Sequence, residues 1–298
     1  MCIRDRIDPQ SGTTLTLGTS GDTVVVPSGV QLAPGGGLTL TGALVVDGGT
    51  IKLDGNYPVG TDNVALGNTA LDSVEAGGTE NTAIGSKAGT AITTGDANTA
   101  LGTCSMLVNT TGIRNTALGH RALDANTDGN CNTAVGMTSL SANIGGDQNT
   151  AVGVSALSLN TTASNNTAVG FESLKLNTTG SSLTALGSFT LDENTTGASN
   201  TAIGSSALNK NTTGDFNIAV GSNALCSNVT SDANTAVGNN ALKLNTATGN
   251  TAIGKDALCC NTSGTANVAI GQATLMRNAT TTRNVAVGQS VLACNVGS

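Results

Sequence analysis

A five-residue pattern of alternating polar and apolar positions recurs along most of the chain. Its consensus is Asn-Thr-Ala-(Ile/Val/Leu)-Gly, and it occurs fourteen times from about residue 63 onward. The spacing is 17 residues, except for one step of 18 and one of 16. The glycines are Gly67, Gly85, Gly102, Gly119, Gly136, Gly153, Gly170, Gly187, Gly204, Gly221, Gly238, Gly254, Gly271 and Gly288. A fixed period of this length indicates a repeat architecture in which each unit packs on its neighbours.

The alternation within the pattern predicts a short β-strand. The residue two before each glycine is always Ala, the residue one before it is Ile, Val or Leu, and the residue three before it is Thr in most units. Successive strand side chains point to opposite faces. The Thr and aliphatic columns therefore share one face, where we expect the aliphatic residue to join the core. We expect the Ala column to form the other face and to allow the close approach of another chain.

The rest of each unit carries two further regular columns. Four residues after the glycine lies Leu in twelve units, with Met106 and Gly89 in the other two. Asn opens thirteen units, with Leu183 as the departure, and a second Asn column lies seven residues after the glycine. Asn and Gly are typical of turns because they tolerate positive φ. We expect a strand, a glycine corner, a second short strand and an Asn-Thr-Thr-Gly turn, with stacked asparagines bonded amide to amide.

These columns predict an all-β fold, a parallel β-solenoid (β-roll) of about fourteen 17-residue coils over residues 61–298. A helix after the glycine corner is the competing prediction, but four or five residues are too few for a stable helix. Residues 7–60 keep no 17-residue register, yet their short alternating runs between Pro and Gly turns predict a β-rich stem or N-terminal cap. We interpret residues 1–6 as a sequencing artefact or a disordered tail.

The composition narrows the classes of partner. The 298 residues carry a net charge of −7, and the 12 Lys and Arg residues are scattered, which argues against a nucleic-acid partner. No apolar run is long enough to span a bilayer, so we expect no membrane insertion of this fragment. The N-terminus lacks the apolar stretch of a signal peptide.

Little in the chain suggests catalysis, and we predict that the protein is not an enzyme. His120 is the only histidine, and we expect it to be an exposed loop residue. The seven cysteines form no Cys-x-x-Cys pair and no regular framework, so we expect free thiols rather than disulfides or a metal centre. Asp72, Asp124 and Asp192 share a column but are too sparse for a repeated calcium site. We therefore assign no catalytic, cofactor-binding or metal-binding residue, and we expect no cofactor.

The repeat resembles known fibre sequences. The pattern at residues 81–85 and 267–271 resembles the head repeats of trimeric autotransporter adhesins, which are left-handed parallel β-rolls of three associated chains. The whole unit is also similar to repeats of phage tail fibres, as residues 11–29 are to tail-fibre stems. The resemblance covers about four fifths of the chain, although the adhesin repeat is shorter. It implies a homotrimer on a virion or a bacterial surface that binds a host receptor, either a protein or a glycan.

Two hypotheses follow from these observations. The first is a structural fibre or adhesin that mediates attachment to a host surface. We expect the natural protein to continue past Ser298, because an uncapped solenoid end would expose its core and its strand edges. The second is an ice-binding solenoid, since the Thr columns could form a regular array of hydroxyl groups. Against the second, Val or Ile replaces Thr in four units of the strand column.

Overall fold

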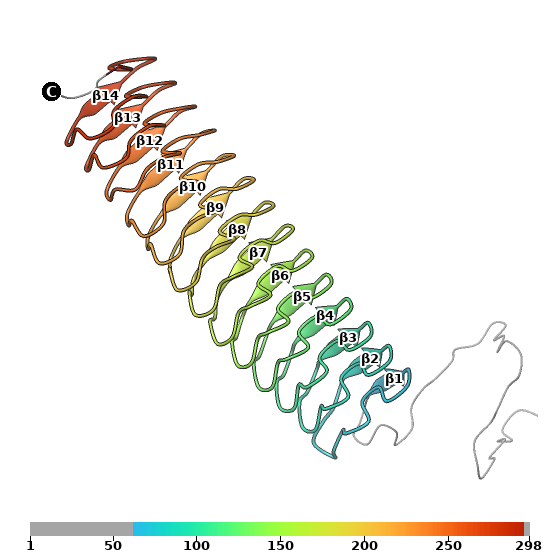
Figure 1. The fold of residues 1–298 in the computed structure, drawn as a ribbon. Helices are drawn as coiled ribbons and strands as arrows, with labels where there is room; N and C mark the ends of the chain where they lie inside the picture. Colours follow the sequence, from blue (N-terminus) through green and yellow to red (C-terminus); the bar gives the residue numbers. More distant parts are fainter. Residues whose placement is uncertain (1–61, 295–298) are drawn as a thin grey trace, which may run out of the picture. The chain divides into compact units, whose positions relative to one another are not determined.

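In the computed structural model of this chain, residues 62–294 form an all-β parallel solenoid (Figure 1). The predicted stem or cap at residues 7–60, the hexapeptide 1–6 and residues 295–298 lie outside the described residues. The strands are β1 (Val64–Leu66), β2 (Thr82–Ile84), β3 (Thr99–Leu101), β4 (Thr116–Leu118), β5 (Thr133–Val135), β6 (Thr150–Val152), β7 (Thr167–Val169), β8 (Thr184–Leu186), β9 (Thr201–Ile203), β10 (Ile218–Val220), β11 (Thr235–Val237), β12 (Thr251–Ile253), β13 (Val268–Ile270) and β14 (Val285–Val287).

All fourteen strands belong to one parallel sheet in the order β1 to β14. Each strand pairs with the next along the chain, so that Ala117 lies beside Ala134 and Leu118 beside Val135. The same columns stay in register through the steps of 18 and 16 residues. Strands in such a stack are about 4.8 Å apart. The predicted fold class, a parallel β-solenoid built from 17-residue coils, is confirmed.

The assignment of strand faces was wrong. The Ala column points into the coil, where Ala134 is fully buried, whereas Leu118 in the aliphatic column is 42 % exposed. The interior is narrow. Leu side chains from the segment after the glycine, such as Leu140, belong to the same buried cluster as the Ala column. Alternation was predicted correctly, but both strand faces are apolar, so the sequence did not show which one lies inside. The Ala column therefore packs within its own chain and is no surface for another.

The predicted second strand does not form, because the chain after each glycine is a succession of turns with alternating backbone handedness. Arg121 has φ of 55° and Leu123 has φ of 53°. The Arg121 N–H donates to Thr103 O in the preceding coil, and the Leu123 N–H donates to Ser139 O in the following one. This tight coiling brings Leu into the interior while keeping the coils hydrogen-bonded. Residues 62–294 contain no helix, and hence none that could cross a membrane.

Both asparagine columns are largely buried and form ladders, as predicted, which are interrupted at Leu183 in the first column and between Asn228 and Asn245 in the second. In the second column, Asn143 Nδ2 donates to Asn126 Oδ1 at 2.8 Å, and Asn160 Nδ2 donates to Asn143 Oδ1 at 2.8 Å. In the first, the Asn149 backbone N–H donates to Asn132 Oδ1 at 2.9 Å. A buried amide without such partners would be costly. The ladders thus join each coil to the next through side chains as well as through the sheet.

Candidate functional site

Two surfaces of the solenoid are candidates for function: the outward face of the sheet and a hollow beside it. The outward face consists of the two columns that flank the buried Ala in every strand. The aliphatic column is Leu66, Ile84, Leu101, Leu118, Val135, Val152, Val169, Leu186, Ile203, Val220, Val237, Ile253, Ile270 and Val287, all exposed or half-buried. We call these residues, together with the Thr column three residues before each glycine, the strand face.

The strand face is uncharged along the whole stack, and its aliphatic column is apolar in every strand. Neither column contains a charged residue, and the fourteen strands extend it over roughly 60 Å at about 4.8 Å per strand. On monomeric proteins, an exposed apolar patch of several hundred Å² marks an interaction site. The strand face is therefore suited to pack against the surface of another molecule.

Threonine hydroxyls on the strand face differ from those in the turns. Among residues 62–294, no hydroxyl of the strand column, such as that of Thr150 or Thr167, donates a hydrogen bond to another described residue. In the turns, Thr178 Oγ1 donates to Thr195 O at 2.9 Å, and Thr195 Oγ1 donates to Thr212 O at 3.0 Å. Thr178 and Thr195 thus link successive coils through their hydroxyls, whereas the hydroxyls of the strand column are left for other partners.

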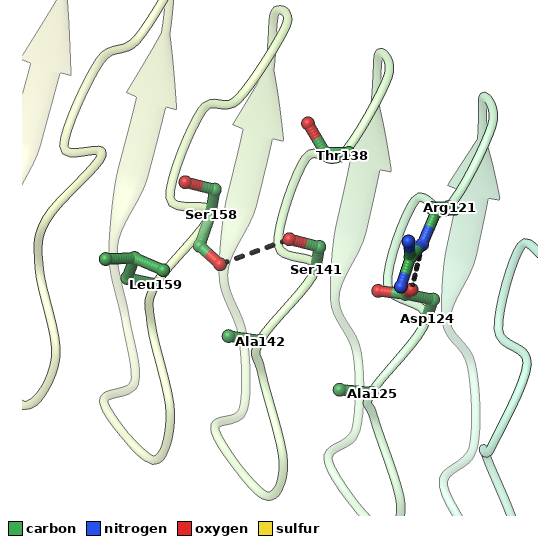
Figure 2. A pocket seen from close by; sticks show the side chains of 8 residues that line it. All are labelled: Arg121, Asp124, Ala125, Thr138, Ser141, Ala142, Ser158 and Leu159. Atoms are coloured by element: carbon green, nitrogen blue, oxygen red, sulfur yellow. Dashed lines mark hydrogen bonds and ion pairs between the residues drawn. The ribbon is translucent and has the colours of Figure 1, made fainter.

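The second surface is a hollow of about 430 Å³ in the turn segments that follow β4, β5 and β6. Figure 2 shows its lining side chains, which come from three successive coils. They are Arg121, Asp124, Ala125, Thr138, Ser141, Ala142, Ser158 and Leu159. None of them belongs to a strand.

Small residues in two neighbouring columns create the hollow. The positions five and six residues after the glycine hold Ser141 and Ala142 in the coil of β5. The next coil places Leu159 at the second of these positions, and the preceding coil places Asp124 at the first. The small side chains of the β5 coil therefore form the floor of the hollow. Asp124 in the preceding coil and Leu159 in the following coil bound it on either side.

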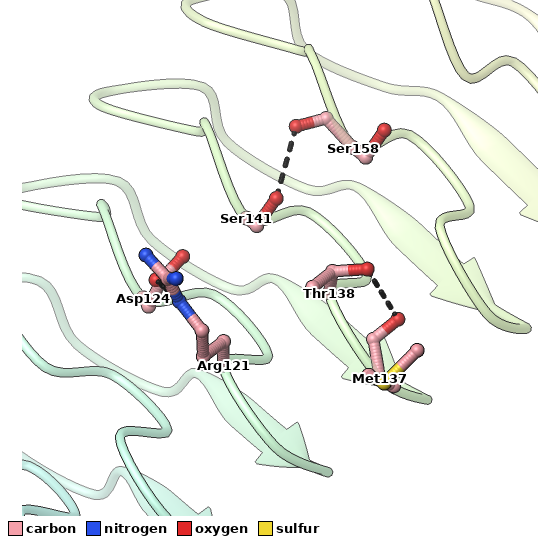
Figure 3. Close-up of polar contacts among 6 residues, drawn as sticks. All are labelled: Arg121, Asp124, Met137, Thr138, Ser141 and Ser158. Atoms are coloured by element: carbon pink, nitrogen blue, oxygen red, sulfur yellow. Dashed lines mark hydrogen bonds and ion pairs between the residues drawn. The ribbon is translucent and has the colours of Figure 1, made fainter.

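Polar contacts fix the side chains around the hollow (Figure 3). Arg121 Nε donates to Asp124 Oδ2 at 2.8 Å, and this hydrogen bond raises the pKa of the arginine. Ser141 Oγ donates to Ser158 O at 3.2 Å, and Thr138 Oγ1 donates to Met137 O at 2.7 Å. The residue Asp124 is buried, and its ion pair with Arg121 places a paired charge at one end of a row of hydroxyls.

The structure does not bring the sequence candidates together. His120 is exposed, as expected. Asp72, Asp124 and Asp192 occupy equivalent positions in separate coils, and no cluster of three or more potential metal ligands occurs among residues 62–294. Burial raises the pKa of the Asp192 carboxyl, although Lys175 opposes the shift.

The cysteines of the described part of the chain, Cys104 to Cys294, form no disulfide. Burial, together with the neighbouring Cys260, raises the pKa of Cys259 to about 11. A thiol of such high pKa is a poor nucleophile near neutral pH, because the thiolate is the reactive form. Cys259 therefore offers no reactive site.

Sequence reasoning missed the hollow and the Arg121–Asp124 ion pair. The available signal was the pair of small residues, Ser141 and Ala142, at positions that hold larger side chains in several other coils. No known protein-family model matches the sequence, and no curated protein matches it. Function must therefore be argued from these two surfaces.

Proposed function

We propose that this protein is the rod-like part of a homotrimeric attachment fibre, either of a phage tail or of a bacterial surface adhesin. One observation carries the proposal: an uncharged aliphatic face runs along all fourteen strands and remains exposed in the single chain. Covering that face would remove side chains such as Leu101, which is 40 % exposed, from water. The resemblance of the repeat to adhesin heads and tail fibres favours three chains.

The strand face replaces the Ala column as the expected contact between chains. Thr beside Val or Leu gives a regular surface with side chains of modest size, which three copies can pack against one another without burying a charge. An interface of this kind resembles a protein core more than a polar rim. A rod with stacked, repeating coils would then serve to hold a receptor-binding surface at a distance from the particle or cell.

The mass of the protein in solution tests the trimer. Sedimentation velocity or light scattering should give the mass of three chains, and a stable monomer would refute the proposal. Val152→Lys combined with Val169→Lys places charges on the strand face and should dissociate the trimer while leaving the circular dichroism spectrum unchanged. Ser227→Lys is the matched control, because Lys210 already occupies the same position in the preceding coil.

The location of the gene tests the biological setting. Neighbouring genes for tail and baseplate proteins would support a virion fibre, whereas a secretion signal on the full-length chain would support an adhesin. If neither kind of neighbouring gene nor a secretion signal is found, the result would support some other use of the solenoid.

A second function, ice binding, is favoured by the free hydroxyls of the strand column. Thr133, Thr150 and Thr167 present hydroxyl and methyl groups at regular intervals on successive strands. Ice binding needs the strand face open to water, whereas the trimer covers it. A monomer with thermal hysteresis would favour ice binding, and a trimer without it would eliminate this alternative.

A further inference from the structure

We propose that the hollow between Arg121 and Leu159 binds a neutral saccharide. This inference rests on the proposed attachment function and assigns it a receptor chemistry. The hollow lies outside the strand face, so association through that face uses none of its lining residues.

The charges at the hollow favour a neutral ligand. Arg121 and Asp124 are its only charged lining residues, and they form an ion pair. An anion that approached Arg121 would meet the Asp124 carboxylate, and a cation would meet the guanidinium. A hydroxyl group can instead accept from arginine and donate to the carboxylate, which satisfies both.

Unused hydrogen-bonding capacity is available at the ion pair. Arg121 uses only Nε toward Asp124, so its two terminal amino groups have no hydrogen-bond partner among the described residues. The Arg121 side chain is 57 % exposed, whereas that of Asp124 is 9 % exposed. The Asp124 carboxylate therefore holds the guanidinium through Nε, and Figure 2 shows the guanidinium lying over this carboxylate.

The remaining lining is amphipathic. Ala125, Ala142 and Leu159 give an apolar floor and wall, and Thr138, Ser141 and Ser158 contribute hydroxyls. A sugar ring has the same division, since its C–H groups gather on one face and its hydroxyls lie around the edge. Small-ligand sites commonly combine an apolar lining with a few fixed polar groups and have volumes of about 300 to 1,000 Å³. At about 430 Å³ the hollow fits a ligand of one or two rings.

The features of the hollow are not imposed by the repeat. The position of Ala142 holds Glu193, Lys210 and Leu244 in later coils. Stacking therefore does not require a small residue there, and a bulky one is compatible with the fold. This tolerance supplies the variant that tests the proposal.

The test is saturation-transfer difference NMR with isothermal titration on the full chain. The probes are methyl α-D-mannoside, methyl β-D-galactoside and N-acetylglucosamine, with N-acetylneuraminic acid as the anionic probe. We expect at least one neutral probe to bind. The Ala142→Leu variant, whose larger side chain fills the hollow, should bind that probe at least tenfold more weakly. Ser227→Leu places the same side chain at the equivalent position of another coil and should bind as the wild type does.

Three results would overturn the inference: no binding of any neutral probe, equal binding by the wild type and Ala142→Leu, or binding of N-acetylneuraminic acid alone. Thermal melts show whether each variant is folded. If Ala142→Leu does not fold, Ala125→Leu, which also fills the hollow, replaces it in the test. The same samples separate the two proposals. A trimer that binds no sugar contradicts the saccharide site alone, and a monomer that binds sugar contradicts the trimer alone.

Discussion

Asn245 does not bond the side chain of Asn228, although the two residues occupy equivalent positions in successive coils. Asn228 Oδ1 is buried without a hydrogen-bond partner, while Asn245 Nδ2 donates to Ala247 O at 2.6 Å. One coil earlier, Asn228 Nδ2 donates to Asn211 Oδ1 at 3.1 Å in the usual way. The break coincides with the 16-residue step, whose missing residue lies in the turn after Asn245. Shortening this turn therefore interrupts one ladder while the sheet continues.

Restoring the missing residue should repair the ladder. Insertion of one Gly between Ala247 and Thr248 gives this turn the length and pattern of residues 261–267. Satisfying a buried acceptor is worth about 1 to 3 kcal/mol, so we expect the free energy of unfolding to rise within that range. Urea denaturation followed by circular dichroism measures the change.

The control for this insertion is the same Gly placed between Ser263 and Gly264, in a turn that already has the usual length. That variant should be no more stable than the wild type. If both insertions have the same effect, the missing residue is not the cause of the broken ladder.

Gly136 is required at its corner for two reasons. Its φ is 130°, and an added Cβ would lie 2.5 Å from Gly153 O in the next coil. Both the backbone strain and the clash oppose a side chain, and strain of this kind alone is worth about 1 to 3 kcal/mol. We expect Gly136→Ala to lower the free energy of unfolding by at least about 2 kcal/mol.

Gly145→Ala is the matched control for Gly136→Ala. Gly145 lies in an open turn at the position of Thr162 in the next coil, and its added Cβ would meet only the movable Asp128 side chain. Its unfolding midpoint should stay near that of the wild type. Equal losses in the two variants would show that the corner imposes no special requirement.

The period, the strands and the asparagine ladders could be predicted because each leaves a regular mark in the sequence. The alternation around Ala134 showed where a strand lies, and the repeated amides at positions such as Asn143 showed what stacks. Register followed from the constant spacing. These features depend on local pattern and on translation from one coil to the next, both of which the sequence displays directly.

The direction of the strand faces and the turn conformation could not be predicted in the same way. Ala and the outward Val or Leu are both apolar, so the sequence pattern alone does not distinguish them. Ala134 points inward because the interior of the coil is too narrow for a larger side chain at that position. Leu140 adopts a φ of 49°, which is unfavourable for leucine, because packing in the interior outweighs the local preference. The hollow arises from single departures among neighbouring coils, which no repeating pattern reveals.

The contribution of the first asparagine ladder can be measured at Asn149. Its Nδ2 donates to Ala163 O at 2.9 Å, and its Oδ1 accepts from the Asn166 N–H at 3.1 Å. Leu183 occupies the same column two coils later, after a turn of the usual length, and is buried there. The Asn149→Leu variant should therefore keep the fold. We expect a loss of about 1 to 3 kcal/mol, because the partners of Asn149 stay buried. Urea unfolding measures it, and an unchanged midpoint would show that the ladder adds nothing to stability.

Asp192 should give the solenoid a pH-dependent weakness. Burial raises the pKa of this carboxyl, and its Oδ1 is buried without a hydrogen-bond partner. A raised pKa means that the folded chain binds the proton more tightly than the unfolded chain. The associated stability is fully present below the ordinary carboxyl pKa and is lost as the pH rises through the raised value. Ionised Asp192 therefore disfavours the folded state at neutral pH.

Asp192→Asn should accordingly raise the melting temperature at pH 7 and have little effect at pH 3, where the wild-type carboxyl is protonated. Because the side chain is half-exposed and solvent screens its charge, we expect a gain of roughly 0.5 kcal/mol or less. Asn209 at the same position of the next coil indicates that an amide fits. Glu193→Gln removes a neighbouring exposed charge and controls for the change in net charge. A gain for Asp192→Asn that is equal at both pH values, or equal to that of Glu193→Gln at pH 7, would contradict this account, since only the desolvated carboxylate is expected to respond to ionisation.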